Sequence, residues 1–521
     1  MIRRRVTRTP GTRVLLLLAL AFGGSQVRGA PAWAQAGPVG SRLVAADHWA
    51  YEYVRRLHGA GYLTGLDLLR QPMTRREIAL RIAVVNPDSL PEPATSWLRL
   101  LREEFAAELE PADGARAGLV LAAGATAANT RRLDPFRPLG EGSVWSRAGA
   151  GAWVETGAFA AETRVVADAY LKHDPDGRSP YLRMGARTDH TYLSFGGNTG
   201  NLFLGRVARN WAPPGLPGLL VSNNPLSYPQ VGMDLRFGRA GFQAFTAQLD
   251  TLEGTRRFLA ANRVAYLAPR LTIAVTEALL YATNSGLSLQ LLNPFTALLF
   301  EHEAPPDENW SQNLMLGLQV WHGGGDWEVY GEGLLDDIDV NPDSGLRRAP
   351  ARYAVMLGMK WRPRGPRVET NTEYRRVSAY AYRSYQMTSR YDYLSRGLGD
   401  HFADYDRLSV SVDVFPPLRG LRLTPAFDLL RQGEGDYRLA FPADSAFRRS
   451  SSLFLGIVER TYRIGLRGRY QPTRHFWLTW DAGHNVIRNA GHVPGASRSK
   501  LVVLVTAGAR LEFGGTIGPR P

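Results

Sequence analysis

One loop carries the side chains best suited to binding chemistry. It lies between two apolar segments and is rich in proline and glycine, with candidate binding residues Arg206, Arg209, Trp211, Asn223 and Asn224. An aromatic ring can pack against the apolar face of a sugar, and asparagine and arginine can hydrogen-bond its hydroxyls. The planar guanidinium also pairs well with carboxylates. The loop therefore predicts a binding site for a polysaccharide, and Glu301 and Glu303 complete the candidate set.

A second interpretation of the same loop is purely structural. Proline restricts the backbone, and asparagine is a common turn residue. These side chains could therefore serve only to fix the path of a long loop. The sequence leaves both interpretations open.

The sequence carries no recognisable motif for catalysis or for metal binding. The chain has no G-x-S-x-G, H-E-x-x-H or P-loop pattern, and it contains no cysteine. His302 lacks a second histidine close by, so we interpret it as a polar loop residue rather than a metal ligand. The acidic run from Asp336 to Asp343 is typical of a solvated loop, with calcium binding as the alternative. We expect no catalytic residue, no metal and no cofactor, and hence a protein that is not an enzyme.

The N-terminus predicts export. Basic residues from Arg3 to Arg13 precede an apolar run at Val14 to Phe22, and Ala32-Trp33-Ala34 fits a cleavage site. We therefore predict a signal peptide at residues 1–34, because the apolar run is too short to span a bilayer. The peptide holds six arginines and no acid, so the net charge falls from +14 to +8 without it. Export excludes a cytoplasmic nucleic-acid partner.

Residues 35–111 predict a small N-terminal α-helical domain. We expect helices over Asp47–Gly59, after the capping box at Thr74–Glu77, and over Ser96–Leu109. The first two resemble a single S-layer homology repeat, which implies binding of a cell-wall polymer. The alternative is a helical bundle that only packs, acting as a periplasmic plug.

Residues 112–521 show strand upon strand with alternating faces. Leu408, Val410, Val412 and Val414 form one row, and polar side chains form the other. Such strands are about ten residues long, enough to cross a bilayer when tilted, and their charged faces suit a wet lumen. We predict a mainly β fold, a large antiparallel transmembrane β-barrel of about 18 strands in contact with outer-membrane lipid. A soluble β-sandwich is the alternative.

The chain resembles the Wzi family of outer-membrane capsule-assembly proteins. The resemblance rests on Leu292-Asn293-Pro294-Phe295 leading to Glu301 and on loop residues Gly205, Arg206, Trp211, Pro213, Gly215, Ser222, Asn223, Asn224 and Pro229. It implies a barrel occluded by its helices that acts as a surface lectin for capsular or extracellular polysaccharide. The location implied is the cell outer membrane. The last predicted strand of the chain, Leu501 to Phe513, resembles the closing strand that the barrel assembly machinery reads. We also expect a monomer.

An alternative function is a peptidoglycan-anchored outer-membrane porin for solute diffusion. Such porins resemble a coiled-coil spacer followed by a barrel, but the segment from Pro111 to Gly118 has no heptads. Channel conductance separates the two functions.

Overall fold

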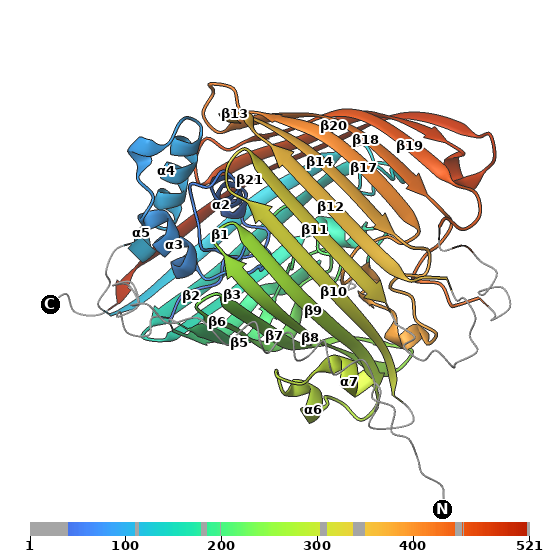
Figure 1. The fold of residues 1–521 in the computed structure, drawn as a ribbon, viewed down its shortest axis with the longest axis horizontal. Coiled ribbons are helices and arrows are strands. Elements are labelled where there is room, and N and C mark those ends of the chain that lie inside the picture. The colour runs from blue at the N-terminus through green and yellow to red at the C-terminus, as the bar shows by residue number, and fades with distance from the viewer. Residues whose placement is uncertain are drawn as a thin grey trace, which may run out of the picture.

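The computed structural model describes residues 40–109, 114–178, 185–197, 199–302, 310–336, 350–442, 451 and 453–517. The predicted signal peptide at residues 1–34 and the candidate residue Glu303 lie outside these ranges. Helices come first along the chain, and strands follow (Figure 1).

Eighteen antiparallel strands form one closed sheet. Each pairs with its sequence neighbours, and the last strand pairs with the first from Ala115↔Ile517 to Ala128↔Leu504. The strands are β1 Ala115–Ala128, β2 Ser143–Thr156, β3 Phe159–Asp168, β4 Ala186–Gly196, β5 Gly200–Val207, β6 Tyr228–Phe237, β7 Ala240–Leu252, β8 Thr255–Ala268, β9 Leu271–Thr283, β10 Ser311–Gly323, β11 Trp327–Asp336, β12 Tyr353–Trp361, β14 Val368–Val377, β17 Tyr405–Val414, β18 Leu421–Gln432, β19 Glu459–Tyr470, β20 Phe476–Arg488 and β21 Ser497–Ile517. The predicted barrel is confirmed, and the β-sandwich is excluded.

Apolar and polar rows of the strands face opposite sides of the barrel wall. On β17, Leu408 and Val410 are exposed on the outer face, whereas Ser409, Ser411 and Asp413 are buried on the lumen face. The outer wall is therefore apolar, as a surface in contact with lipid must be, and the charges gather inside.

The two ends of the barrel differ. At one end, the short-turn end, strands are joined by connections such as residues 157–158, 197–199 and 238–239. At the other, the long-loop end, the connections include residues 208–227 and 378–404. The short strand β13 Pro363–Pro366 lies in the connection between β12 and β14 at the short-turn end, and β15 Asp392–Tyr393 and β16 Arg396–Gly397 lie in the connection 378–404.

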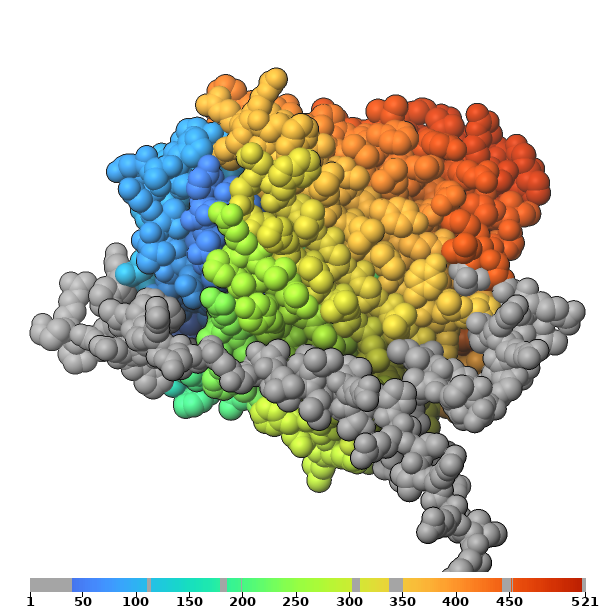
Figure 2. All heavy atoms as spheres, in the orientation of Figure 1, coloured from blue at the N-terminus to red at the C-terminus, as the bar shows by residue number. Residues whose placement is uncertain are grey.

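In the described residues before the barrel there are four α-helices: α2 Ala50–Gly59, α3 Arg75–Ala83, α4 Ala94–Glu104 and α5 Ala106–Leu109. They form a block at the short-turn end (Figures 1 and 2). The Thr74 hydroxyl accepts a hydrogen bond from the Glu77 amide at 3.2 Å, as the capping box predicts. Helix α2 begins at Ala50, three residues after the predicted Asp47. None of the helices in the described part of the chain is long and apolar enough to cross a membrane.

Ion pairs join the helical segment to the lumen wall. Arg56 of α2 donates to Glu369 at 3.0 Å and to Asp413 at 2.6 Å. Asp67 accepts from Arg263 of β8 at 2.6 Å. In these pairs a charge on a helix or its loop meets an opposite charge on a strand, which offsets the cost of taking both out of water.

Candidate functional site

The loop that carries the predicted binding residues folds into the lumen of the barrel. Trp211 and Arg209 are fully buried there. The Trp211 ring packs edge-on against Phe245, 5.7 Å between centroids, and the Arg209 guanidinium lies 4.4 Å from the Phe203 ring centroid. Both side chains therefore contact strands β5 and β7 rather than solvent.

Loop 208–227 joins two other parts of the molecule. On one side Asn210 exchanges backbone hydrogen bonds with Gln71 of the helical segment, at 2.9 and 3.0 Å. On the other side the Ser222 amide donates to the Leu398 carbonyl at 2.8 Å, and the Asn224 side chain donates to the Gly399 carbonyl at 2.6 Å. Loops 208–227 and 378–404 thus pack on each other inside the barrel, and we call them the lumen plug.

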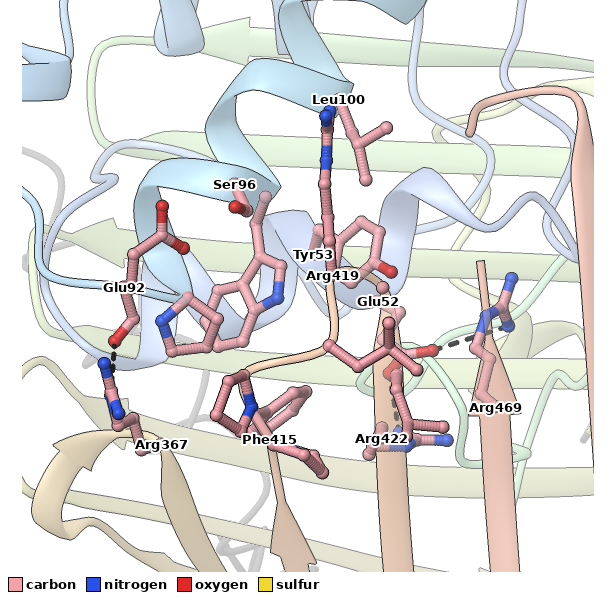
Figure 3. Close-up of a pocket in the computed structure, with 17 residues that line it drawn as sticks. Glu52, Tyr53, Glu92, Ser96, Leu100, Arg367, Phe415, Arg419, Arg422 and Arg469 are labelled. Carbon is pink, nitrogen blue, oxygen red and sulfur yellow. Dashed lines mark hydrogen bonds and ion pairs between the residues drawn. The ribbon is translucent and has the colours of Figure 1, made fainter. Parts of the chain in front are cut away.

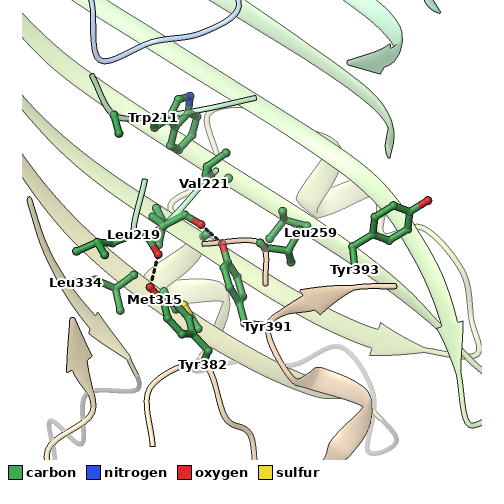
Figure 4. Close-up of a cluster of buried hydrophobic side chains, with 14 of the residues drawn as sticks. Trp211, Leu219, Val221, Leu259, Met315, Leu334, Tyr382, Tyr391 and Tyr393 are labelled. Atoms are coloured by element: carbon green, nitrogen blue, oxygen red, sulfur yellow. Dashed lines mark hydrogen bonds between the residues drawn. The ribbon is translucent and has the colours of Figure 1, made fainter. Parts of the chain in front are cut away.

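Tyrosines complete the lumen plug. The Tyr382 hydroxyl donates to the Leu219 carbonyl at 2.6 Å, and the Tyr391 hydroxyl donates to the Leu220 carbonyl at 2.9 Å (Figure 4). Around these contacts lies a buried apolar cluster that includes lumen-facing side chains from β4 to β18. Its members include Phe203, Phe245, Leu259, Leu280, Met315, Tyr330, Leu334, Met356, Tyr405 and Leu430. Apolar packing therefore fills the lumen at this level.

The remaining candidate residues take different positions. Arg206 donates to the Ser227 carbonyl at 2.7 Å, and Asn223 is exposed. Glu301 lies on α7 Leu298–His302, which packs outside the barrel wall against β8, β9 and β10. The structure therefore does not gather the candidate residues into one site, since Arg206 belongs to β5, Arg209 and Trp211 are buried in the lumen, and Glu301 lies outside the wall. The burial of Arg209 and Trp211 fits the structural interpretation of the loop, and a binding role for the set stays a prediction.

A pocket that the sequence did not reveal opens at the long-loop end. It has a volume of about 430 Å³ and is built by four connections between strands. At its centre Phe402 lies under the Arg137 guanidinium, 4.0 Å from the ring centroid, and edge-on to His401. We call this the mouth pocket. Its other lining residues include Arg132, Gln432, Glu434, Asp436, Tyr437, Glu459, His492 and Arg498.

The mouth pocket combines one aromatic ring, on which Arg137 stacks, with many hydrogen-bonding groups. Arg137 is held by Asp134 at 2.9 Å and by Gln432 at 2.8 Å, so its position is fixed. Burial lowers the pKa of His401 to about 4, which keeps the imidazole neutral at neutral pH. Its Nδ1 accepts from the Gly397 amide at 3.3 Å, so Nε2 carries the proton. Nε2 is buried, has no hydrogen-bond partner among the described residues and lies 4.0 Å from the Asp176 carboxylate.

No sequence signal could have located the mouth pocket. Its residues come from connections as far apart as 129–142 and 489–496, and each segment alone is an ordinary polar loop. Only closure of the barrel, which pairs β1 with β21, brings them together. Within the ranges given above, no group of three or more acidic or histidine side chains could hold a metal ion.

A second pocket, of about 250 Å³, lies at the short-turn end between α4 and residues 415–422 (Figure 3). Glu52 lines it and accepts from Arg422 at 2.6 Å, with Arg469 at 3.4 Å. Both arginines are thus held by Glu52, which also pairs with Arg56 at 3.4 Å. We interpret this pocket as part of the junction between helices and barrel.

Together these features define the class of the protein. A closed antiparallel barrel satisfies every strand edge, and an apolar outer wall with charges inside suits lipid outside and water or protein within. The chain is an outer-membrane β-barrel, with loops 208–227 and 378–404 packed inside its lumen.

Among solved structures, the chain is similar to Wzi of Escherichia coli, described as an outer membrane protein involved in group 1 capsule assembly and a carbohydrate-binding β-barrel. The TM-score is 0.63 at 13% identity, covering 91% of this chain and 100% of Wzi. OccAB4 and OccAB3 of Acinetobacter baumannii give TM-scores of 0.43 and 0.45 at 10% identity, each covering 77% of this chain and 99% of the other. No protein-family model matches the sequence, and no curated protein does so either. The fold expected from the Wzi resemblance is confirmed.

Proposed function

We propose that this protein is a surface lectin that attaches or assembles capsular or extracellular polysaccharide at the long-loop end. The mouth pocket carries the proposal, because it combines a guanidinium stacked on an aromatic ring with many other polar lining side chains. Such a set matches a sugar ring with hydroxyl or carboxylate substituents. In this proposal the pocket binds the sugar and does not catalyse a reaction. The carbohydrate-binding description of Wzi, whose fold this chain shares, supports the same function.

The orientation of the barrel supports a cell-surface role. In outer-membrane barrels the short turns lie in the periplasm and the long loops outside the cell. By this rule the mouth pocket faces outward, and the helices at residues 50–109 act as a periplasmic plug. The filled lumen favours binding over solute diffusion. A monomer inserted by the barrel assembly machinery completes the proposal.

The proposal is tested by removing the aromatic ring of Phe402. Phe402→Ala is expected to weaken binding of the purified barrel to the producing strain's own extracellular polysaccharide by about tenfold or more, since central aromatic contacts in binding sites contribute over about 1 kcal/mol. Surface plasmon resonance on the immobilised polymer measures the affinity. Cells carrying the variant should also retain less polymer.

A matched control is Tyr385→Ala, which removes an exposed aromatic ring of the same loop that does not line the mouth pocket. It should bind like the parent. Unchanged affinity in a correctly assembled Phe402→Ala barrel would refute the lectin function of this pocket.

A further inference from the structure

Part of the outer wall is covered by the protein itself. On β8, Val264 and Tyr266 point outward and are each 40% exposed, but Asn262 on the same face is only 9% exposed. The covering segment is residues 284–302, with helices α6 Leu289–Leu292 and α7, and it lies outside the barrel beside β8 and β9 (Figure 1). We call it the outer flap.

Specific polar contacts hold the outer flap to the wall. The Glu277 carboxylate accepts from the backbone amides of Leu298 at 3.1 Å and Leu299 at 3.2 Å. Asn262 donates to the Thr296 carbonyl at 2.7 Å, and Thr246 donates to the Leu291 carbonyl at 2.7 Å. Polar side chains that would otherwise face lipid are thereby satisfied, so the flap is a built part of the wall.

The outer flap also exposes large apolar side chains. Leu289 is 82% exposed, Phe295 68% and Phe300 57%, and the Phe295 ring stacks on Phe242 of the wall. Exposed large apolar side chains are unfavourable in water and favourable in a bilayer. The flap therefore lies in the membrane, beside the lipid that surrounds the barrel.

An apolar pocket of about 400 Å³ lies between the tip of the outer flap and the wall. The flap contributes Leu291, Leu292, Pro294 and Leu298, and strands β4 to β7 contribute outward-facing Leu193, Phe195, Leu202, Leu204, Val231, Met233 and Ala244. This volume falls within the range of about 300–1,000 Å³ that is usual for ligand pockets. An apolar lining offers water no hydrogen bonds, so a hydrocarbon is the matching occupant.

The pocket lies in the half of the wall near the short-turn end. Phe195 is one residue from the end of β4, and Leu202 is two residues from the start of β5, both at that end. Exposed Phe195, Phe237 and Tyr266 mark the same end with aromatic rings, as at a membrane interface. The pocket thus extends from this interface toward the flap tip.

We propose that the pocket binds one acyl chain of a glycerophospholipid from the periplasmic leaflet, with the outer flap as its clamp. The leaflet follows from the short-turn end, which faces the periplasm in barrels of this kind. The proposal is independent of the lectin function, since the pocket and the mouth pocket share no residue.

Native mass spectrometry of the full barrel in mild detergent tests the proposal. The delipidated protein is offered phosphatidylethanolamine alone or lipid A alone. The parent should retain one phosphatidylethanolamine and little lipid A. Ala244→Phe and Met233→Trp each fill the pocket and should lower retention by about tenfold, because losing burial of about two methylene groups is sufficient for that loss.

The matched control is Val264→Phe, which adds the same bulk on the outer face of β8 away from the pocket and should retain lipid like the parent. Heat-modifiable migration identifies the folded barrels, and Met233→Trp alone decides the outcome if Ala244→Phe fails to fold. The proposal is overturned if the filled variant retains as much lipid as the parent, if the parent retains none, or if lipid A is preferred.

Discussion

At the scale of single residues, the junction between helices and barrel depends on buried charge pairs. Burial alone would raise the pKa of Glu52, but the guanidiniums of Arg422, Arg469 and Arg56 outweigh it and lower the pKa to about 2. A carboxylate with a depressed pKa stabilises the folded state. This stabilisation is fully present above the pKa of the unfolded state, about 4.3, and is lost as the pH falls toward 2.

We therefore expect α2 to stay docked at pH 5 and to loosen only below about pH 4. Hydrogen–deuterium exchange of residues 50–59 between pH 7 and pH 3 measures this. Glu52→Gln should loosen α2 already at pH 7, since it leaves two arginines without their charged partner, at a cost of about 1–3 kcal/mol. Loss of protection between pH 7 and pH 5 in the parent would contradict the assignment.

At the scale of elements, the lumen plug depends on loop side chains that are buried inside the barrel, such as Trp211. Trp211→Ala should lower the free energy of unfolding by about 3–5 kcal/mol, because it leaves a cavity among fully buried side chains. Denaturant unfolding in detergent measures the change. The control is Asn223→Ala, an exposed position of the same loop, which should change stability by less than about 0.5 kcal/mol. Equal stability of Trp211→Ala and parent would show that Trp211 does not order the loop.

The strands were predictable because lipid imposes a simple rule on the sequence. Every second residue must be apolar where the outer face meets the membrane, as Leu408 and Val410 do, and this period is visible without any other information. The Thr74 cap was predictable for the same reason, since its partner Glu77 is three residues away.

The paths of the loops were not predictable. Trp211 has the same sequence context whether it meets a sugar or Phe245, and the choice depends on contacts between distant segments. Glu301 likewise resembles a loop acid, yet the outer flap carries it outside the wall. Contacts between distant segments leave no periodic pattern in the amino-acid sequence.

At the scale of the whole molecule, the closed ring and the filled lumen act together. Closure leaves no exposed strand edge in the bilayer, and the helices at one end with the lumen plug beyond them occupy the interior. The proposed binding function needs no open path through the barrel, whereas solute diffusion would.

Planar-bilayer conductance tests this account most directly. A barrel that lacks residues 40–109, and whose loops 208–227 and 378–404 are replaced by short glycine-serine linkers, serves as the control and should give steady channel currents, which shows that the barrel inserts. The parent protein should insert equally well and give no steady current. Sustained, ohmic current steps from the parent would contradict a plugged binding barrel and favour a porin.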